Sequence, residues 1–407
     1  MREKFFCKML LVMLLNILLI AGLNACEKKD DSKESTTNTS TQSNTIKIGE
    51  YGALTGRIAN FGISTKNGVK LAQEEYNKAG GLLGKQIEVI VEDDRSQQQE
   101  AKSAVQKLID KDRVIAVLGE VASTNSIAGG TVCQEKGIPM ISPSSTNPKV
   151  TQIGDHVFRV CFIDTFQGEV MARFAATKLG LKKVAILHDN GSDYSVGLRD
   201  QFTKTFKELG GEILLDEAYQ QGDPDFNAQL TKIRALKPEA IYVPGYYDDV
   251  GKIAVQSRSL GIKVPLLGGD GWDSPALLET DEKKQAFNGC YISNHYSVED
   301  QDPDIQKFVN TYKAKYGIVP DALAALGYDA ARILFEAIKK AGSTDSKAIR
   351  DAIAQTKDFK GVTGTITIGP KRDAVKPAVI IAIENGNYKL RDKIQPSSEA
   401  VQASAGQ

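Results

Sequence analysis

The chain has 407 residues, with 51 basic and 51 acidic side chains. This balanced charge, without a basic block in the body of the chain, gives no electrostatic footprint for nucleic acid, which we exclude as a partner. The three histidines lie far apart, and no His/Cys spacing typical of a metal site occurs. We therefore expect neither a metal nor a cofactor.

The N-terminal segment has the pattern of a secretory signal peptide over residues 1–25. Basic residues precede an apolar run from Met9 to about Ala21, which is short for a membrane span. The following L-N-A-C, ending at Cys26, resembles the lipobox of bacterial lipoproteins, which makes Cys26 the expected lipidation site. An ordinary signal peptide that contains a cysteine is the alternative. We expect an exported protein, periplasmic or on the outer cell surface, anchored to a membrane by lipid.

Two terminal segments have compositions that cannot form a core. Residues 26–45 are polar and predict a flexible tether, and residues 395–407 predict a disordered tail. Loss of residues 1–25 removes three basic and one acidic residue, so the mature chain keeps 48 basic and 50 acidic residues. The folded part between the two segments is long enough for two domains.

Strand-like runs alternate with helical stretches through most of the folded part, first over about 100 residues and then again. This alternation predicts parallel sheets with right-handed crossovers, and hence an α/β fold of two doubly wound, Rossmann-like lobes. The predicted strands are Ile46–Tyr51, Ile87–Glu92, Val114–Leu118 and Pro139–Ser142 in the first half, and Lys183–His188, Ile213–Ala218, Ala240–Val243, Val264–Leu267 and Gly289–Ser293 in the second.

The C-terminal part predicts three helices, then a strand pair near Thr363–Ile368 and Val379–Ile383, with a hairpin turn at Asn385-Gly386. The chain therefore crosses between the lobes more than once, through a multi-crossing hinge. We assign residues 46–165 and 294–373 to the N-lobe, and residues 166–293 and 374–394 to the C-lobe.

The residues that follow the strands predict a ligand site, because ligands of open α/β sheets bind at the carboxyl ends of the strands. In the first lobe these residues are Ser123 and the hydroxyls of Ser144–Thr146, beside a helix that begins near Thr124 and presents its N–H groups to an anion. In the second lobe they are Tyr194, Tyr246 and Asp270, a set suited to an ammonium group. A carboxylate side facing an ammonium side describes a site for an α-amino acid.

Each of these residues has a purely structural alternative. Ser123 could serve as a helix N-cap, the hydroxyls of 144–146 could be loop polarity, and the tyrosines could be packing residues. Asp270 lies in G-G-D-G-W, which reads equally as a turn. Three remaining cysteines, Cys133, Cys161 and Cys290, allow one disulfide or none.

Several motifs in order make the sequence resemble the branched-chain amino acid (leucine/isoleucine/valine) solute-binding proteins, within the type I periplasmic binding proteins. The resemblance runs from Ile46 to the C-terminal strands. Its motifs are G-A-L-T-G (52–56), A-G-G-L-L-G-K (79–85), Asp93-Asp94, G-I-P-M-I-S-P-S-S-T (137–146) and L-G-Y-D-A (326–330). The resemblance implies a two-lobed receptor that closes about a hinge and delivers an amino acid to an ATP-driven permease.

Position by position, the resemblance assigns the ligand-binding roles. The carboxylate clamp falls on Ser123 and Thr146, with groups near Ser144; the ammonium acid falls on Asp270, near Ser144 and Thr146. The pocket aromatics fall on Phe61, Tyr194 and Tyr246, and Trp272 could narrow the pocket or pack under the loop. Two positions depart from the family pattern: Asp270 stands where Glu is frequent, and Phe61 where Tyr or Trp is also common, so the side-chain preference stays open.

The function we expect is capture of a branched-chain or other apolar amino acid by a monomeric receptor. The alternative is a lipid-anchored binding protein that presents another small polar solute, such as an amide, a urea-like compound or a carboxylate, to a signalling partner. An enzyme is disfavoured because the chain contains no G-x-S-x-G, G-x-G-x-x-G, complete P-loop or H-E-x-x-H motif. A regulator on the same fold would need a DNA-binding segment ahead of the first strand, where an export signal stands.

Overall fold

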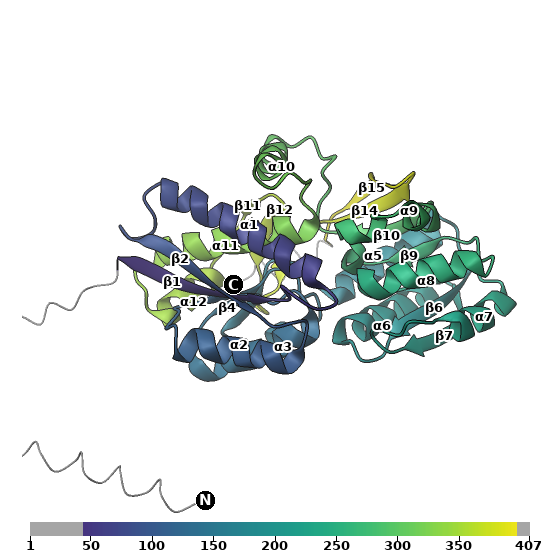
Figure 1. The fold of residues 1–407 in the computed structure, drawn as a ribbon, viewed down its shortest axis with the longest axis horizontal. Coiled ribbons are helices and arrows are strands. Elements are labelled where there is room, and N and C mark those ends of the chain that lie inside the picture. Colours follow the sequence, from purple (N-terminus) through teal and green to yellow (C-terminus); the bar gives the residue numbers. More distant parts are fainter. Residues whose placement is uncertain (1–43, 397–407) are drawn as a thin grey trace, which may run out of the picture. The chain divides into compact units, whose positions relative to one another are not determined.

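The structure is a computed structural model that describes residues 44–396 (Figure 1). The predicted signal peptide, Cys26 and nearly all of the tether lie outside the described residues, as does the tail from residue 397. Between residues 44 and 396, no helix has the length and apolar character needed to cross a membrane.

The N-lobe is built on a five-stranded parallel sheet of order β2-β1-β3-β4-β5. The short strands β4 and β5 are buried along their whole length, as expected for strands covered by helices on both faces. The strands are β1 (Thr45–Gly52), β2 (Gln86–Asp93), β3 (Val117–Leu118), β4 (Met140–Ser142) and β5 (Val157–Arg159).

Helices cover both faces of this sheet. Helices α1 and α11 pack together on one face, and α2 and α3 pack together on the other (Figure 1). The helices of this lobe are α1 (Ala59–Lys78), α2 (Gln98–Asp110), α3 (Ser123–Lys136), α4 (Lys149–Gln152), α10 (Pro303–Tyr316), α11 (Ala322–Ala341) and α12 (Ser346–Ala354).

The C-lobe is built on a seven-stranded sheet of order β15-β14-β10-β9-β8-β6-β7. The strands from β10 to β7 pair in parallel, and β14 and β15 add antiparallel at one edge. The strands are β6 (Lys183–Asp189), β7 (Glu212–Tyr219), β8 (Ala240–Tyr242), β9 (Leu266–Gly268), β10 (Cys290–Asn294), β14 (Ala378–Glu384) and β15 (Asn387–Ile394).

The helices of the C-lobe alternate with its parallel strands. Helix α5 continues into one π-helical turn over Phe174–Lys178, and 3₁₀ turns cover Asp270–Trp272 and Pro275–Leu278. The α-helices are α5 (Asp164–Arg173), α6 (Asp193–Glu208), α7 (Asn227–Leu236), α8 (Tyr247–Ser259) and α9 (Asp281–Ala286).

The two strands predicted near Thr363–Ile368 and Val379–Ile383 are present, and they lie in different sheets. Strand β12 (Gly364–Ile368) pairs with β11 (Phe359–Gly361) and β13 (Ala374–Val375), whereas β14 joins the C-lobe sheet beside β10. The apolar pattern of a strand sets which face is buried but does not name its partner. The predicted hairpin is confirmed: β14 and β15 are joined at Asn385 and Gly386, both with positive φ.

The α/β fold class is confirmed, with three crossings between the two large sheets. The crossings lie between β5 and α5, between β10 and α10, and between β13 and β14. Because β13 pairs with β12, the small sheet extends two residues past the boundary predicted at residue 373. The domain boundaries themselves stay a prediction.

Helix α1 begins at Ala59, whereas the spacing of apolar residues in the sequence predicts a helix only from about Thr65 to Lys78. The G-A-L-T-G-R-I-A-N-F-G segment reads as a loop because of its glycines. Gly62, however, lies inside the helix, where a Cβ would stand 2.2 Å from the Ala53 carbonyl oxygen. The glycine permits close contact between the helix and the loop after β1, and it places Phe61 on the first helical turn.

Two further points concern side chains across the molecule. Cys133, Cys161 and Cys290 are all buried free thiols, so no disulfide joins them.

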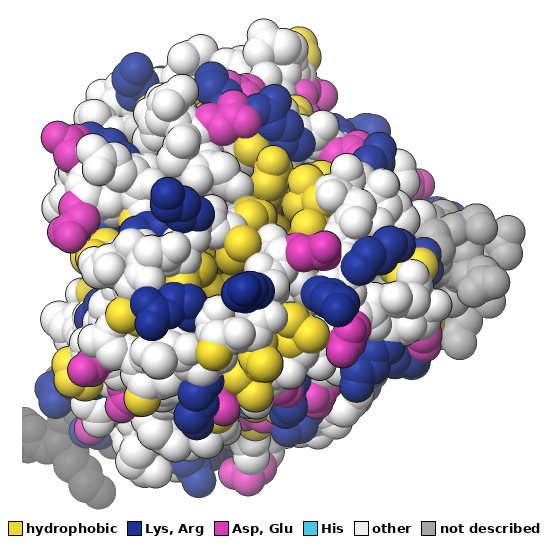
Figure 2. All heavy atoms as spheres, turned by 90° about the vertical axis from the view of Figure 1, so that its right-hand side faces the viewer, with side chains coloured by type: hydrophobic (Ala, Val, Ile, Leu, Met, Phe, Trp, Pro, Cys, Tyr) yellow, Lys and Arg dark blue, Asp and Glu magenta, His cyan; other side chains and the backbone are white. Residues whose placement is uncertain are grey.

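Figure 2 shows basic and acidic side chains interspersed on one face, around a hollow where hydrophobic side chains gather. This face carries charges of both signs.

Candidate functional site

Residues of both lobes enclose a small cavity at the carboxyl ends of the parallel strands. Its volume is about 10 Å³, close to the space that one water molecule needs. The cavity is lined by Phe61, Val121, Ser144, Tyr194, Tyr246, Asp270, Gly271 and Leu323. Five of the eight predicted site residues therefore meet here: Phe61, Ser144, Tyr194, Tyr246 and Asp270.

The two lobes contact each other directly around this cavity. The Asn60 N–H donates to the Tyr247 hydroxyl at 3.2 Å, and the Asn147 side chain donates to the Asp193 carbonyl oxygen at 2.6 Å. Lys149 forms an ion pair of 2.7 Å with Asp193. A solute larger than water can enter only if these contacts separate.

On the N-lobe side, α3 begins two residues after Val121, which lines the cavity. This 14-residue helix begins at Ser123, and its N-cap, Ala122, offers no side-chain acceptor. The N-cap residue therefore supplies no side-chain cap, although the Tyr246 hydroxyl contacts the Ser123 backbone, and the helix dipole favours an anion there. The alternative of Ser123 as N-cap is wrong, because Ser123 lies inside the helix and its hydroxyl accepts from the Asn147 N–H at 3.2 Å.

A buried carboxyl group holds the loops around this helix start. Glu120 accepts hydrogen bonds from the N–H groups of Ala53 (3.2 Å) and Ala122 (2.5 Å). Burial raises the pKa of Glu120 well above its usual value, and the neighbouring Asp94 acts in the same direction. Glu120 thereby ties the loop after β1 to the residues that precede α3.

The predicted hydroxyl residues differ in their positions. Ser144 lines the cavity and donates to the Val121 carbonyl oxygen at 3.2 Å. Thr146 is fully buried, and its hydroxyl has no aligned hydrogen bond to a described residue. Burial raises the pKa of the neighbouring Asp164 well above its usual value, and the Thr146 hydroxyl opposes this effect. Ser123 and Thr146 lie in the structure next to the lining residues rather than among them.

The C-lobe side of the cavity presents the carboxylate of Asp270, which three neutral donors hold in place. Oδ1 accepts from the Tyr194 hydroxyl and the Gln167 amide, each at 2.9 Å, and Oδ2 accepts from Nε2 of His295 at 2.9 Å. No Lys or Arg among residues 44–396 lies within 4.0 Å of this carboxylate. A buried anion fixed by neutral donors retains its attraction for a cation.

His295 acts as a neutral donor in this arrangement. Burial lowers the pKa of His295 to about 4, against the opposing effect of Asp270. Its ring stacks on Phe162, with centroids 3.8 Å apart. The ring is thus fixed, and its Nε2–H points to Asp270.

Aromatic rings line the cavity next to the carboxylate. Tyr194 and Tyr246 are stacked with centroids 4.9 Å apart, and Phe61 meets Tyr246 edge-on at 5.9 Å. Burial raises the pKa of Tyr246 well above its usual value, and a hydrogen bond with the Ser123 backbone acts in the opposite direction. An ammonium group beside Asp270 would therefore also meet aromatic faces.

The glycines of G-G-D-G-W allow this close packing. A Cβ on Gly269 would stand 2.7 Å from the Tyr194 hydroxyl, and one on Gly271 would stand 2.7 Å from the Gly245 carbonyl oxygen. The turn interpretation and the ligand-binding interpretation of this segment are therefore compatible, because the bend that glycine permits points Asp270 into the cavity.

Trp272 does not line the cavity. Its side chain is fully buried in the C-lobe, donates from Nε1 to the Val243 carbonyl oxygen at 2.9 Å, and packs edge-on against Phe287. Of the two predicted alternatives, the structure shows the one in which the ring packs under the loop.

Sequence reasoning missed five residues of the site: Val121, Gly271, Leu323, Gln167 and His295. For His295 a signal existed, since it lies two residues after a predicted strand, at the same edge of the sheet. Gln167 lies within α5, and Leu323 lies at the start of α11, in a different lobe from Asp270. No local pattern marks either of them. Among the described residues, no group of three or more metal-ligating side chains gathers in one place.

Comparisons with known proteins agree with this architecture. The family model described as "Periplasmic binding protein" matches residues 45–387. The Leu/Ile/Val-binding protein BraC3 of Rhizobium johnstonii is 32% identical over 332 residues, covering 81% of this chain and 88% of the relative. The chain therefore belongs to the periplasmic binding protein family, a family of substrate-binding proteins.

Solved structures show the same fold. The leucine-binding protein LivK of Thermotoga maritima is 41% identical with a TM-score of 0.83, covering 86% of this chain and 99% of that one. LivJ of Streptococcus pneumoniae, solved with isoleucine, is 36% identical with a TM-score of 0.82, covering 86% and 100%. A solute-binding protein of Rhodopseudomonas palustris, solved with 3,4-dihydroxybenzoic acid, is 26% identical with a TM-score of 0.79, covering 88% and 99%.

Proposed function

We propose that this protein captures a free α-amino acid with an apolar, branched side chain between its lobes and delivers it to a membrane-embedded, ATP-driven permease. The observation that carries the proposal is the Asp270 carboxylate, which is buried, fixed by three neutral donors and lacks a cationic partner within the described chain. On the N-lobe side, α3 begins two residues after the lining residue Val121 and has no side-chain cap from its N-cap residue. These two features match the ammonium and the carboxylate of an amino acid.

The rest of the lining supports an apolar side chain. Phe61, Val121 and Leu323 contribute hydrophobic surface, and the printed names of the relatives above include leucine, isoleucine and valine. A cavity of about 150 Å³ accommodates benzene, so the present volume of about 10 Å³ implies that the lobes separate before binding and close over the solute. Ser123, Ser144 and Thr146 then serve the carboxylate, with Ser144 and Thr146 also near the ammonium group.

A carboxylate without an amino group is the second candidate, because one relative was solved with 3,4-dihydroxybenzoic acid. Such a ligand would leave the negative charge of Asp270 buried and unpaired beside a second anion, which is unfavourable. The arrangement therefore favours the amino acid. Lipid attachment at Cys26, a monomeric state, and a permease rather than a sensor as partner complete the proposal.

The test is a thermal-shift screen of the twenty amino acids, with benzoate, urea and acetamide as controls, followed by calorimetric titration of every solute that raises the melting temperature. We expect leucine, isoleucine or valine to give the largest shifts. A shift with benzoate alone, or with urea alone, would replace the proposal by the corresponding alternative.

A further inference from the structure

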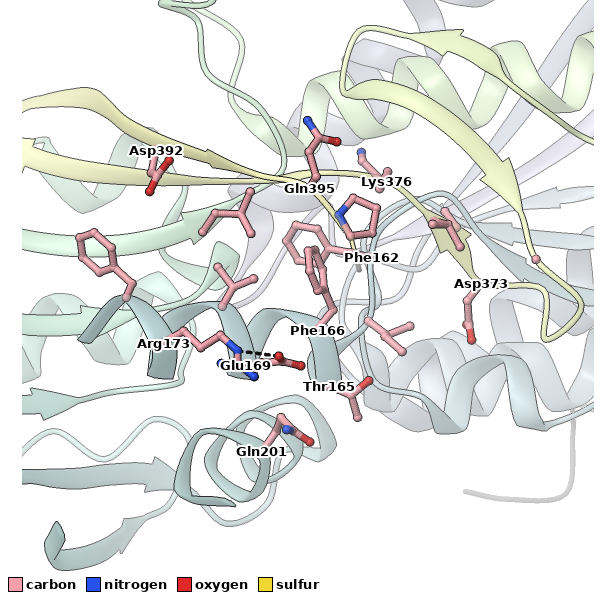
Figure 3. Close-up of a pocket in the computed structure, with 18 of the residues that line it drawn as sticks. Phe162, Thr165, Phe166, Glu169, Arg173, Gln201, Asp373, Lys376, Asp392 and Gln395 are labelled. Carbon is pink, nitrogen blue, oxygen red and sulfur yellow. Dashed lines mark hydrogen bonds and ion pairs between the residues drawn. The ribbon is translucent and has the colours of Figure 1, made fainter. Parts of the chain in front are cut away.

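A second, much larger cavity lies beside the crossings between the lobes, and the proposed function does not use it. Its volume is about 840 Å³, within the usual range for small-molecule sites. We call it the hinge cavity. Its walls are the segment that leads into α5, helices α5 and α6, the residues around β13, and the end of β15 (Figure 3).

The floor of the hinge cavity is apolar. Phe162 and Phe166 meet edge-on with centroids 6.0 Å apart, and both rings lie on the same wall (Figure 3). The apolar residues that line the cavity include Phe162, Phe166, Val170, Phe174, Val375 and Ile394. A ligand with a sizeable apolar body would remove this surface from water.

The charges around the cavity leave an excess of unpaired cations. Each lining carboxylate already has a cationic partner: Glu169 pairs with Arg173 at 2.7 Å, Asp392 with Lys178 at 3.4 Å, and Asp373 with Arg159 at 2.7 Å. Lys204 and Lys371 also line the cavity, and no carboxylate within residues 44–396 comes within 4.0 Å of either ammonium group.

A third lysine is buried in the wall. Lys376 is 1% exposed, and its ammonium group donates to the Thr363 hydroxyl, its one hydrogen-bond partner in the described chain. Burial lowers the pKa of Lys376 to about 8. The carboxylate of Asp329, which accepts from the same Thr363 hydroxyl, opposes this lowering, so Lys376 already has a counter-charge close by.

We infer that the hinge cavity is a binding site for an amphipathic anion, a molecule with an extended apolar body and one carboxylate or similar head group. The apolar floor receives the body, and the lining lysines without a carboxylate partner, Lys204 and Lys371, offer the head group its counter-charge. An apolar cation would face these ammonium groups instead, and a neutral molecule would leave them unpaired.

The hinge cavity also touches residues that hold both halves of the amino acid site. Phe162 in its floor stacks on His295, which donates to Asp270. On the other side, Asp373 pairs with the fully buried Arg159, which donates to the carbonyl oxygens of Ser145 and Asn147, on either side of Thr146. An occupant is therefore expected to change amino acid affinity, a consequence that rests on the proposed function.

The test is calorimetric titration of the full chain with sodium decanoate, with 1-decanol and decyltrimethylammonium as neutral and cationic controls. We expect one decanoate per chain and binding at least about tenfold weaker for both controls. Equal binding of all three would show non-specific apolar adsorption and overturn the proposal. If decanoate fails to bind the full chain but binds a chain ending at Pro396, the occupant is the chain's own C-terminal segment.

Two variants locate the binding. The double variant Lys204→Glu/Lys371→Glu changes exposed side chains and should weaken decanoate binding about tenfold or more while leaving leucine affinity unchanged. Its matched control is Lys207→Glu/Lys357→Glu, which alters exposed lysines outside the cavity. Unchanged decanoate affinity in the first variant would contradict the assignment.

The second variant, Val375→Trp, fills the cavity from a half-buried position and should abolish decanoate binding. Saturating decanoate should shift the leucine affinity of the wild-type chain at least about threefold and leave that of Val375→Trp unchanged. Failure of leucine to bind at all would refute the proposed function. The decanoate titration would still show whether the hinge cavity binds an amphipathic anion.

Discussion

Asp270 and His295 come from different strands of the C-lobe sheet, and a hydrogen bond of 2.9 Å from Nε2 to Oδ2 joins them. Asp270 follows β9, and His295 follows β10, where the chain crosses toward the N-lobe. The residue proposed to hold the ligand's ammonium group is thereby connected to a hinge crossing.

This relationship predicts that His295 positions Asp270. His295→Phe keeps an aromatic ring against Phe162 but removes the donor, which should weaken leucine binding by about tenfold, since one hydrogen bond to a charged group contributes roughly 1.5–3 kcal/mol. His295→Gln restores an amide donor and should recover part of the affinity, as measured by calorimetry. His156→Phe is the control and should bind as the wild type does. Equal affinity of His295→Phe and wild type would refute the role.

The burial of Glu50 predicts that the folding stability of the protein depends on pH. It is 3% exposed in β1, and burial raises its pKa from 4.5 to about 8, with Lys66 opposing. Because the folded-state pKa lies above the unfolded value, the stability that protonated Glu50 supports is complete below pH 4.5 and is lost as the pH rises through about 8. Glu50→Gln stays neutral, so its stability relative to wild type should increase over this range by up to about 5 kcal/mol.

Urea unfolding of both proteins across this pH range measures the difference. Glu88→Gln, an exposed change on the neighbouring strand, is the control and should show no comparable trend. A difference between Glu50→Gln and wild type that stays constant with pH would contradict the prediction.

Trp272→Phe should lower stability and leave the ligand preference intact. The change removes the hydrogen bond to Val243 and opens space beside Phe287, which should cost about 2–4 kcal/mol of unfolding free energy. Leucine affinity should stay within about twofold, since the ring does not line the cavity. A change of amino acid preference at unchanged stability would contradict this prediction and show that Trp272 contributes to the ligand site.

Gly271→Ala should weaken ligand binding indirectly, by displacing the turn that carries Asp270 or the Tyr194 hydroxyl beside it. The added Cβ would stand 2.7 Å from the Gly245 carbonyl oxygen and 2.9 Å from the Tyr194 hydroxyl, so the turn or the tyrosine must shift. We expect a loss of affinity of about tenfold in a calorimetric titration. Gly251→Ala, whose Cβ meets only the end of Lys283 at 3.5 Å, is the matched control. Unchanged affinity in Gly271→Ala would show that the turn tolerates a side chain.

The sequence predicted the parts of the site that follow directly from strand ends. Ser144, Tyr194, Tyr246 and Asp270 each follow a strand of a parallel sheet, and the common edge of such a sheet brings them together. Phe61 came from the family resemblance, and the structure places it in the first turn of α1 rather than in the predicted loop, because Gly62 is a residue type typical of loops.

The remaining features depend on long-range packing, which local patterns do not encode. The pairing of Val379–Ile383 with β10, nearly 90 residues earlier in the chain, follows from the last crossing between the lobes and not from the strand's own apolar pattern. Trp272 lies two residues from the site acid, yet its ring turns into the core beneath the loop. Leu323 reaches the cavity because α11 begins beside the opposite lobe.

The central claim is that the buried charge of Asp270 binds the ammonium group of an amino acid. Asp270→Asn keeps the size of the side chain and removes only the charge, and Glu282→Gln, an exposed neutralisation, is the control. Calorimetric titration of isoleucine should give a loss of affinity of at least about 100-fold for Asp270→Asn, as expected when a buried ion pair loses one partner, and none for Glu282→Gln. Equal isoleucine affinity in Asp270→Asn and wild type would contradict the account.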